Sequence, residues 1–600
     1  MSASADQGSQ KIKCLVIQLT RLGDSIQSLM ALRAAQQLYP NLEITFVAHE
    51  KFAKASQCTP WIKRTYVMPT EALLNPILQS KKSILESVPD FAAWLEPLTE
   101  TPWDMVINWS YSTPSSFLTA LIPAKIKLGY TRKNDKTPHT LDGWSHYIQS
   151  IVQSDIHQGI HLTDIFTTQL LTSLQIHYGE PKDPGDATVT SKSFFTLGEK
   201  QIIHKDWNKP GIRWIAIQLG ASTPEKQFDI EGWAKLCAMI IRRHDEYRFI
   251  LLGNQNEISL QREFEDHILK EISVHTMNER IISKVGQSTF EYWAQIIADS
   301  QWVFTADTSA VHLASVLGTR VFNLSCGNVR FSETGPYGNG HYIVKSQNVE
   351  AIYAAWTYAA TEWRHQRSIS IESHFEKLEI KSKLNEIEIF RSKIRSADQG
   401  GGVYYERITK KAMNLETWTS IVLSHIAREW YCGWTPPVGQ ELERETLSPE
   451  LIQVMRKLQE GIVVLEQICT EAIRSADQLH LKTKNLKSEK LMKLEDRSNI
   501  QELGAKLSEL ESLIHRVGNA QDPLLAFSRM IKVILHCLSG EKISELSEET
   551  AHAYRFLKIG ILSMRNWIEH TLKIAKPVAV IEPSADVIQL KSEINPRSKL

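Results

Sequence analysis

The stretch "QWVFTADTSAVHLASVLGTRVFNLS" (301–325) holds two short apolar runs on either side of a helix-like segment. The first run ends at Ala306, the polar turn 307–309 follows, and the pattern then predicts a helix from about Ala310 to Leu317. Gly318 stands where such a helix would end, directly before the second run. Two strands joined by a helix are typical of a parallel sheet, so this stretch predicts an α/β fold.

The same alternation fills residues 12 to 350 in two similar series. Strand candidates in the first series are 13–19, 43–49, 104–109 and 125–130, and those in the second are 213–220, 247–253, 301–306 and 319–325. The tripeptide Ile-Gln-Leu closes the first strand of each series, at 17–19 and at 217–219. The stretch 177–193 between the series is rich in proline, glycine and small polar residues, which suits an interdomain linker. We therefore expect two doubly wound, Rossmann-like domains in tandem, at 12–185 and 195–362.

After residue 362 the short apolar strands give way to long, charged, helix-period segments. We expect a linker at 363–402, with glycines at 400–402, and an α-helical bundle over 403–600. Ser448-Pro449 is a reasonable start for the first long helix, and Gly518 a reasonable stop for the second. Apolar residues recur at alternating steps of four and three, at 451, 455, 458, 462, 465, 469 and 472 and again at 503, 507, 510, 514 and 517. Such a seam indicates either packing inside the bundle or a homo-oligomer formed through the helical extension.

Composition excludes several function classes. Hydrophobic content of 42% and charged content of 23% are typical of a soluble globular chain, and its 600 residues are too many for one core. Lys plus Arg (68) equals Asp plus Glu (68), so no general field attracts nucleic acid, which we do not expect as a partner. The seven cysteines are widely spaced, and no C-x-x-C pair predicts a metal site. Residues 1–11 lack a signal-peptide core, no run is long enough to span a membrane, and we expect a disordered N-terminus and a cytoplasmic protein.

The loop after the first strand carries one acidic residue, Asp24, in "LVIQLTRLGDSIQSLMALRAAQ" (15–36). Aspartate is a favoured helix N-cap, and Gln27 three residues later completes a capping-box-like pair. A carboxylate beyond the end of a strand can also take a proton from a bound hydroxyl, so a cap and a general base are both open. The loop has a single glycine and therefore no G-x-G-x-x-G fingerprint, and the chain has no P-loop.

Loops of the second series hold the candidates for anion binding. "QLGASTPEKQF" (218–228) places small and hydroxyl residues, then Lys226, directly after a strand; the alternative is a solvated lysine in a polar loop. Asp307, Thr308 and Ser309 precede a helix whose free N–H groups would attract an anion, or Asp307 or Ser309 is simply its cap.

Two further acidic positions allow a structural explanation. Glu257 follows the strand 247–253 and could accept hydrogen bonds from sugar hydroxyls or favour a helix dipole. Ser288 to Glu291 has capping-box spacing before an amphipathic helix, which favours a structural role for both residues.

Taken in order, "RLGD", "GASTPEK", "LLGNQNE" and "DTSAVHLASVLGTRV" resemble the signature of glycosyltransferase family 9, which includes the ADP-heptose:lipopolysaccharide heptosyltransferases. The resemblance covers residues 12 to 345. It implies the glycosyltransferase B architecture of two Rossmann-like domains and a nucleotide-sugar donor bound mainly by the second domain. It also implies transfer with inversion and without a metal or other cofactor.

Carried over by position, the resemblance assigns roles to named residues. Asp24 matches the family's general base, Lys226 the lysine on the donor diphosphate, and Glu257 the acid that contacts the donor. The remaining donor-site candidates are Ser222, Thr223, Asp307, Thr308, Ser309 and His312. The chain departs from the family at Ser309 and Ala310, where glycine and proline are usual, which puts the identity of the donor in doubt more than its binding.

The resemblance leads us to expect an inverting, metal-independent transferase that moves a sugar, heptose in the first instance, from a nucleotide-diphosphate donor such as ADP-heptose. The expected acceptor is a hydroxyl group of lipopolysaccharide or another surface glycan, with peripheral contact to the membrane that carries it. A first alternative is a protein O-glycosyltransferase whose helical extension docks the polypeptide acceptor. A second alternative is a non-catalytic scaffold with a glycosyltransferase-like fold.

Overall fold

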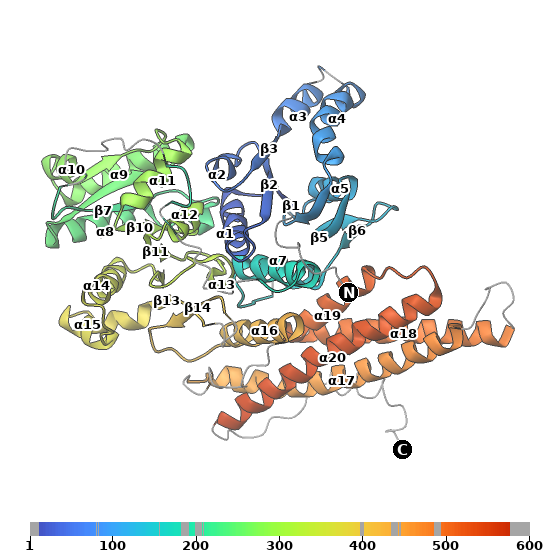
Figure 1. Cartoon of the computed structure of the whole chain (residues 1–600). Coiled ribbons are helices and arrows are strands. Elements are labelled where there is room, and N and C mark those ends of the chain that lie inside the picture. Colours follow the sequence, from blue (N-terminus) through green and yellow to red (C-terminus); the bar gives the residue numbers. More distant parts are fainter. Residues whose placement is uncertain are drawn as a thin grey trace. The chain divides into compact units, whose positions relative to one another are not determined.

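The computed structural model describes residues 11–575, with the exception of 80, 82, 155, 182–190, 192, 198–206, 208, 397–400, 434–441, 443–445 and 485–493. The chain divides into two compact units, of which the first comprises residues up to Tyr130 together with Ile160–Lys410. Thr131–Gly159 and the chain from Lys411 onward make up the second (Figure 1). The predicted disordered segment at the N-terminus and most of the predicted linker 177–193 lie outside the described residues.

The amino-terminal half of the first unit contains a parallel sheet in the strand order β3-β2-β1-β4-β5. The strands are β1 (Ile12–Gln18), β2 (Leu42–His49), β3 (Arg64–Met68), β4 (Trp103–Asn108) and β5 (Ala124–Arg132). The helices are α1 (Leu22–Leu38), α2 (Lys54–Gln57), α3 (Thr70–Leu78), α4 (Ile84–Glu100), α5 (Thr113–Leu121) and α7 (Leu162–Tyr178). All four strands predicted in the first series are present, and the order places the end of β1 between β2 and β4.

The second half of this unit contains an eight-stranded sheet in the order β14-β13-β12-β11-β10-β7-β8-β9. Its parallel strands are β7 (Arg213–Gln218), β8 (Tyr247–Leu252), β9 (Ile281–Ser283), β10 (Trp302–Thr305), β11 (Arg320–Leu324) and β12 (Tyr342–Lys345). Its helices are α8 (Ile230–Arg243), α9 (Ile258–Glu271), α10 (Val274–Arg280), α11 (Phe290–Asp299), α12 (Ser309–Val316), α13 (Phe331–Thr334), α14 (Val349–His365) and α15 (Ile371–Lys377). The two predicted α/β domains are therefore confirmed.

The predicted linker at 363–402 is wrong, because it contains a helix and a strand of the second sheet. α15 follows α14 closely, and β13 (Glu388–Ile394) then pairs antiparallel with β12. β14 (Val403–Arg407), expected to be part of the helical extension, pairs antiparallel with β13. The run "EIFRSKI" of β13 has three charged residues among seven, so it lacks the unbroken apolar run by which the parallel strands are recognised.

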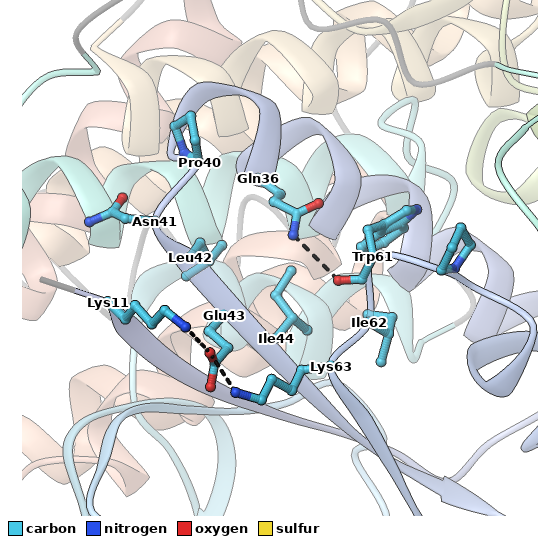
Figure 2. A pocket seen from close by; sticks show the side chains of 11 residues that line it. Lys11, Gln36, Pro40, Asn41, Leu42, Glu43, Ile44, Trp61, Ile62 and Lys63 are labelled. Atoms are coloured by element: carbon cyan, nitrogen blue, oxygen red, sulfur yellow. Dashed lines mark hydrogen bonds and ion pairs between the residues drawn. The ribbon is translucent and has the colours of Figure 1, made fainter. Parts of the chain in front are cut away.

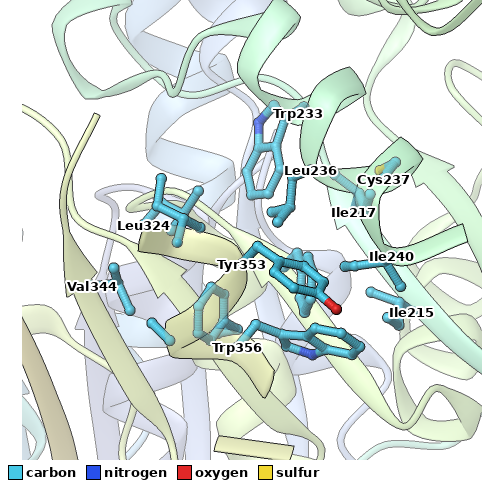
Figure 3. Close-up of a cluster of buried hydrophobic side chains, with 14 of the residues drawn as sticks. Ile215, Ile217, Trp233, Leu236, Cys237, Ile240, Leu324, Val344, Tyr353 and Trp356 are labelled. Atoms are coloured by element: carbon cyan, nitrogen blue, oxygen red, sulfur yellow. The ribbon is translucent and has the colours of Figure 1, made fainter. Parts of the chain in front are cut away.

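Large aromatic side chains fill the core of the second half. Trp356 of α14 and Trp233 of α8 are fully buried with Ile215 and Ile217 of β7 (Figure 3). Tyr247 meets the ring of Trp356 edge to face, with 5.2 Å between ring centroids. Both faces of the central strands are covered, which explains why they appear in the sequence as unbroken apolar runs.

The second unit is mainly helical. It contains β6 (Pro138–Thr140), α6 (Gly143–Tyr147), a π-helical turn (Ile148–Val152), α16 (Leu415–Cys432), α17 (Pro449–Thr483), α18 (Leu494–Ala520), α19 (Asp522–His536) and α20 (Ile543–Ile574). Residues 131–159, expected in the amino-terminal domain, therefore belong with the C-terminal helices. No helix among the described residues is long and apolar enough to cross a membrane.

The predicted helix start at Ser448 is confirmed, because the Ser448 hydroxyl accepts a hydrogen bond from the N–H of Leu451. The predicted stop at Gly518 is wrong by two residues, since α18 continues to Ala520. Every apolar position of the first seam is buried, and α17 packs along α20 within the same unit. This seam therefore forms internal packing of the bundle.

Candidate active site

The loop between β1 and α1 presents Asp24 at the carboxyl end of the first sheet. α1 begins at Leu22, so the N-cap is Arg21 and Asp24 occupies the third helical position. The Asp24 carboxylate accepts a hydrogen bond from the backbone N–H of Arg21, at 3.2 Å. The predicted cap at Asp24, paired with Gln27, is therefore wrong: the helix starts earlier, and Asp24 is the acidic partner at the end of the capping box.

The surroundings of Asp24 suit a base. Its burial raises the pKa of the carboxyl group, while hydrogen bonds from Thr20 and the Arg21 N–H lower it. The positive charges of Arg21 and Lys226 also lower this pKa. A carboxylate whose pKa is raised toward neutrality accepts a proton more readily than an exposed one, provided that it remains ionised.

Lys226, from the loop after β7, forms an ion pair with one carboxylate, that of Asp307, and its charge lowers the pKa of a second, that of Asp24. Its Nζ is 3.2 Å from Oδ2 of Asp307, which follows β10. Burial raises the pKa of Asp307, Lys226 lowers it, and the negative charge of Asp24 raises it further. Two predicted donor-site residues and the predicted base therefore share one electrostatic cluster, in which Arg21 and Lys226 balance Asp24 and Asp307.

In the turn after β10, Thr308 is the N-cap of α12. Its hydroxyl accepts a hydrogen bond from the N–H of Ala310 at 3.2 Å and lies 2.8 Å from the hydroxyl of Thr305. The prediction that Asp307 or Ser309 caps this helix is therefore wrong, because Asp307 is engaged by Lys226 and Ser309 is the first helical residue. A similar shift occurs at α11, where Thr289 and not Ser288 is the N-cap.

Ser222 and Thr223 lie exposed in the loop that leads to the short 3-10 helix Pro224–Lys226. Thr223 precedes this turn without capping it through its side chain. The two hydroxyl groups are thus accessible beside Lys226, at the carboxyl end of β7.

Glu257 organises two loops of the second half. Its carboxylate accepts hydrogen bonds from the Asn254 N–H, at 3.0 Å, and from Nε2 of Gln218, at 3.1 Å. Gly220 and Gly253 pack directly against this carboxylate, where a Cβ at either position would collide with it. Burial raises the pKa of Glu257, and these hydrogen bonds lower it.

Gln218 is a residue that the sequence interpretation missed, although its signal was present. Gln18 and Gln218 occupy the same place in the repeated Ile-Gln-Leu, at the end of the first strand of each sheet. Gln18 accepts from the Thr20 hydroxyl at 2.6 Å, and Gln218 donates to Glu257. Each glutamine therefore fixes a loop of the site from the end of a strand.

His312 lies at the end of the first turn of α12 and faces α1. Its side chain is buried, and its Nε2 is 3.4 Å from Nε2 of Gln27. A Cβ at Gly23 would lie 2.9 Å from Cδ2 of His312. Burial, with a smaller effect from His161, lowers the pKa of His312 to about 3, so the ring is neutral. His312 thus forms the contact between the loop that carries Asp24 and the helix behind Asp307.

A hollow of about 290 Å³ lies elsewhere, at the amino ends of β1 and β2 (Figure 2). Lys11 and Lys63 line it, and both bind Glu43, at 3.1 and 2.8 Å. The opposite edge of the sheet carries Asp24, so this hollow is no part of the candidate site. Over the described ranges, no group of three or more His, Cys, Asp and Glu side chains is arranged to hold a metal ion.

Residues 92–354 match the sequence profile of Glycosyltransferase family 9 (heptosyltransferase). Lipopolysaccharide heptosyltransferase 1 of Campylobacter coli is 23% identical over 258 residues, which cover 42% of this chain and 68% of that protein. The profile match covers three of the four loop motifs and supports sugar transfer as the activity, whereas RLGD at 21–24, with Asp24, lies before the matched residues.

Solved structures similar to the chain include two of heptosyltransferase or family 9 proteins. E. coli heptosyltransferase WaaC with ADP-2-deoxy-2-fluoro heptose is 16% identical, with a TM-score of 0.42 over 60% of this chain and 100% of that one. The family 9 glycosyl transferase of Veillonella parvula DSM 2008 is 16% identical, with a TM-score of 0.43 over 62% of this chain and 97% of that one.

Proposed function

We propose that this chain is an inverting, metal-independent heptosyltransferase, because residues 92–354 match the profile of glycosyltransferase family 9. The proposed donor is ADP-heptose, and the proposed acceptor is a hydroxyl group of lipopolysaccharide or a related surface glycan. The matching family is described as heptosyltransferase, and the Campylobacter coli relative is a lipopolysaccharide heptosyltransferase. The observation that carries the proposal is the cluster of Asp24, Lys226 and Asp307 at the carboxyl ends of both sheets.

In the proposed reaction, Asp24 acts on the acceptor. Its carboxylate removes the proton from the acceptor hydroxyl while the oxygen attacks the anomeric carbon of the donor sugar. The bond between that carbon and the diphosphate oxygen breaks, and the electron pair leaves with the nucleotide diphosphate. Attack from the face opposite the leaving group inverts the configuration at the anomeric carbon.

Lys226 and the start of α12 act on the leaving group. The lysine ammonium and the positive end of the α12 dipole stabilise the negative charge that grows on the diphosphate. Asp307 holds Lys226 at 3.2 Å, and this ion pair orients the lysine in the donor loop. Thr308 and Ser309, with Ser222 and Thr223, supply hydroxyl groups to the same diphosphate.

A second candidate concerns the acceptor. Residues 131–159 leave the first sheet after β5, join the helical unit, and return to α7 at Ile160. The chain thus passes between the helical unit and the half that carries the proposed base at two points, after Tyr130 and before Ile160. A third crossing, after Lys410, leads from the second half into the helical unit. This connectivity favours a role for the helices in choosing the acceptor, which a protein O-glycosyltransferase would need.

Donor binding tests the site, and product analysis then separates the two acceptors. Calorimetric titration with ADP-heptose, UDP-N-acetylglucosamine and GDP-mannose should give binding of ADP-heptose alone. Lys226→Met should weaken binding by roughly 10- to 100-fold, as expected for a lost charged contact. Absence of binding to every nucleotide sugar would contradict the donor site. Mass spectrometry of lipopolysaccharide and protein fractions after incubation then shows which one gains a heptose.

A further inference from the structure

The first turn of α7 carries a buried acidic residue that the proposed chemistry does not use. Asp164 has only 8% of its surface exposed. Its Oδ1 accepts a hydrogen bond from the Tyr337 hydroxyl at 2.7 Å, and its Oδ2 accepts one from the backbone N–H of Val403 at 3.0 Å. Asp164 belongs to the amino-terminal half of the first unit, and both donors belong to the second half. The carboxylate therefore joins the two halves.

The strand β14 is shaped around this carboxylate. Gly402 has a φ of +78°, and a Cβ at this position would collide with Oδ2 of Asp164. On the same strand, the Tyr405 hydroxyl donates to the carbonyl of Pro336 at 3.3 Å. The hairpin of β13 and β14 thus contacts both α7 and the turn Gly335-Pro336-Tyr337. This hairpin lies beyond residues 92–354, which match the family profile.

His161, the N-cap of α7, forms a second bond to the same turn. Its Nδ1 accepts from the Thr163 N–H at 3.1 Å, so the proton of the neutral ring is on Nε2. This Nε2 donates to the carbonyl of Gly335 at 3.0 Å. Burial lowers the pKa of His161, which keeps the ring in this neutral form.

The turn also reaches the helix behind the donor loop. The Tyr337 N–H donates to the hydroxyl of Ser315 at 3.0 Å, and this hydroxyl donates to the carbonyl of Val311 at 2.7 Å. Both residues lie on α12, whose first turn carries Ser309 and His312. On the other side, α7 packs against α1, whose first turn carries Asp24. A continuous set of contacts therefore extends from the proposed base to the proposed diphosphate site.

We propose that Asp164 is a positioning residue that, through Tyr337 and the β13–β14 hairpin, holds the acceptor half and the donor half at their catalytic spacing. Its effect on transfer rests on the proposed function, whereas its effect on the spacing does not. Removal of the carboxylate leaves the Tyr337 hydroxyl and the Val403 N–H without their acceptor, so the two halves separate more easily. A displacement of about 1 Å between reacting groups lowers the rate roughly 100-fold.

The test compares Asp164→Ala with a control of the same chemistry. Asp229 caps α8 by accepting from the Gly232 N–H at 2.7 Å, inside the donor half alone. Spin labels at cysteines introduced at the exposed positions Lys51 and Lys270 report the distance between the halves in the full chain. Asp164→Ala should broaden this distance distribution and lower kcat for transfer from ADP-heptose by roughly 10- to 100-fold, with donor Kd within about threefold of wild type. Asp229→Ala should lower Tm and leave both the distances and kcat unchanged.

Asp164→Asn keeps one carbonyl oxygen and should restore the narrow distance distribution and most of kcat. Identical distance distributions in wild type and Asp164→Ala would overturn the proposal. So would equal losses of kcat in Asp164→Ala and Asp229→Ala, since those would report stability alone. Broadened distances in Asp164→Ala, with no transfer by the wild type to any acceptor, would support the positioning role and refute the proposed function.

Discussion

Substitution of Gly23 by alanine tests the contact between the Asp24 loop and the donor half. The added Cβ would lie 2.9 Å from Cδ2 and 3.2 Å from Nε2 of His312. Carbon atoms pack best at about 3.5–4.0 Å, so α1 and α12 must separate by roughly 0.6–1.1 Å. The His312 ring is buried, 3.4 Å from the Gln27 amide nitrogen, and has little room to turn aside.

The expected loss of activity is larger than the expected loss of stability. Overpacking costs about 1–3 kcal/mol of unfolding free energy. Alanine at a helical position returns about 1 kcal/mol relative to glycine. The separation of α1 from α12 nevertheless moves Asp24 away from the donor by up to about 1 Å, which should lower kcat roughly 100-fold. Donor Kd should change little, because the donor loops belong to the second half.

The assay measures nucleotide diphosphate release from ADP-heptose, donor Kd by calorimetry, and Tm, each for Gly23→Ala and for Gly504→Ala. Gly504 lies in α18, and a Cβ there meets no atom within 4 Å. Gly504→Ala should therefore raise the unfolding free energy by about 0.5–1 kcal/mol and leave kcat unchanged. Wild-type kcat in Gly23→Ala would refute the contact between Gly23 and His312 as a determinant of catalytic spacing.

Three further predictions concern the donor loops, the core and pH. Glu257→Gln replaces a charged acceptor of two hydrogen bonds, so donor Kd should rise by roughly 10- to 100-fold in calorimetry; an unchanged Kd would contradict the loop-organising role. Trp356→Ala empties a fully buried site and should lower the unfolding free energy by about 3–5 kcal/mol in urea titration; an unchanged unfolding free energy would contradict its place in the core. Burial raises the pKa of Asp24 above 3.8, so kcat/KM should fall as the pH drops through that raised value, and Asp24→Asn should lack this acid limb. For stability the sign is opposite: the contribution of Asp24 is present below pH 3.8 and lost as the pH rises through the raised pKa.

The sequence predicts the strand ends better than the helix starts. Apolar runs bounded by polar loops locate β1 and β10 closely, since a buried parallel strand requires an unbroken apolar run. Helix caps are less certain because several adjacent residues can cap. At α1 and α12 the cap falls at Arg21 and Thr308, since Asp24 and Asp307 are engaged by other partners.

Long-range contacts explain what the sequence could not show. No local sequence motif marks Asp164, because it lies in a helix of mixed composition. Its hydrogen-bond donors lie 173 and 239 residues away in the sequence. Residues 131–159 contain helical and strand signals that suit either unit, and only their packing assigns them to the second. The β13–β14 hairpin lies where charged residues suggest a linker, because most side chains of its two strands are half-buried or exposed and can be polar. Local sequence pattern thus predicts the helices and strands, whereas tertiary contacts determine which unit and which sheet each of them joins.

The most direct test of the account is single-turnover transfer from ADP-heptose to a lipopolysaccharide fraction by wild type and by Asp24→Asn, with donor Kd measured on the same preparations. Asparagine keeps the shape of the side chain and removes the proton acceptor. We predict a rate lower by roughly 100- to 10,000-fold, with donor Kd within about threefold of wild type. Transfer by Asp24→Asn at the wild-type rate would contradict the assignment of Asp24 as the general base.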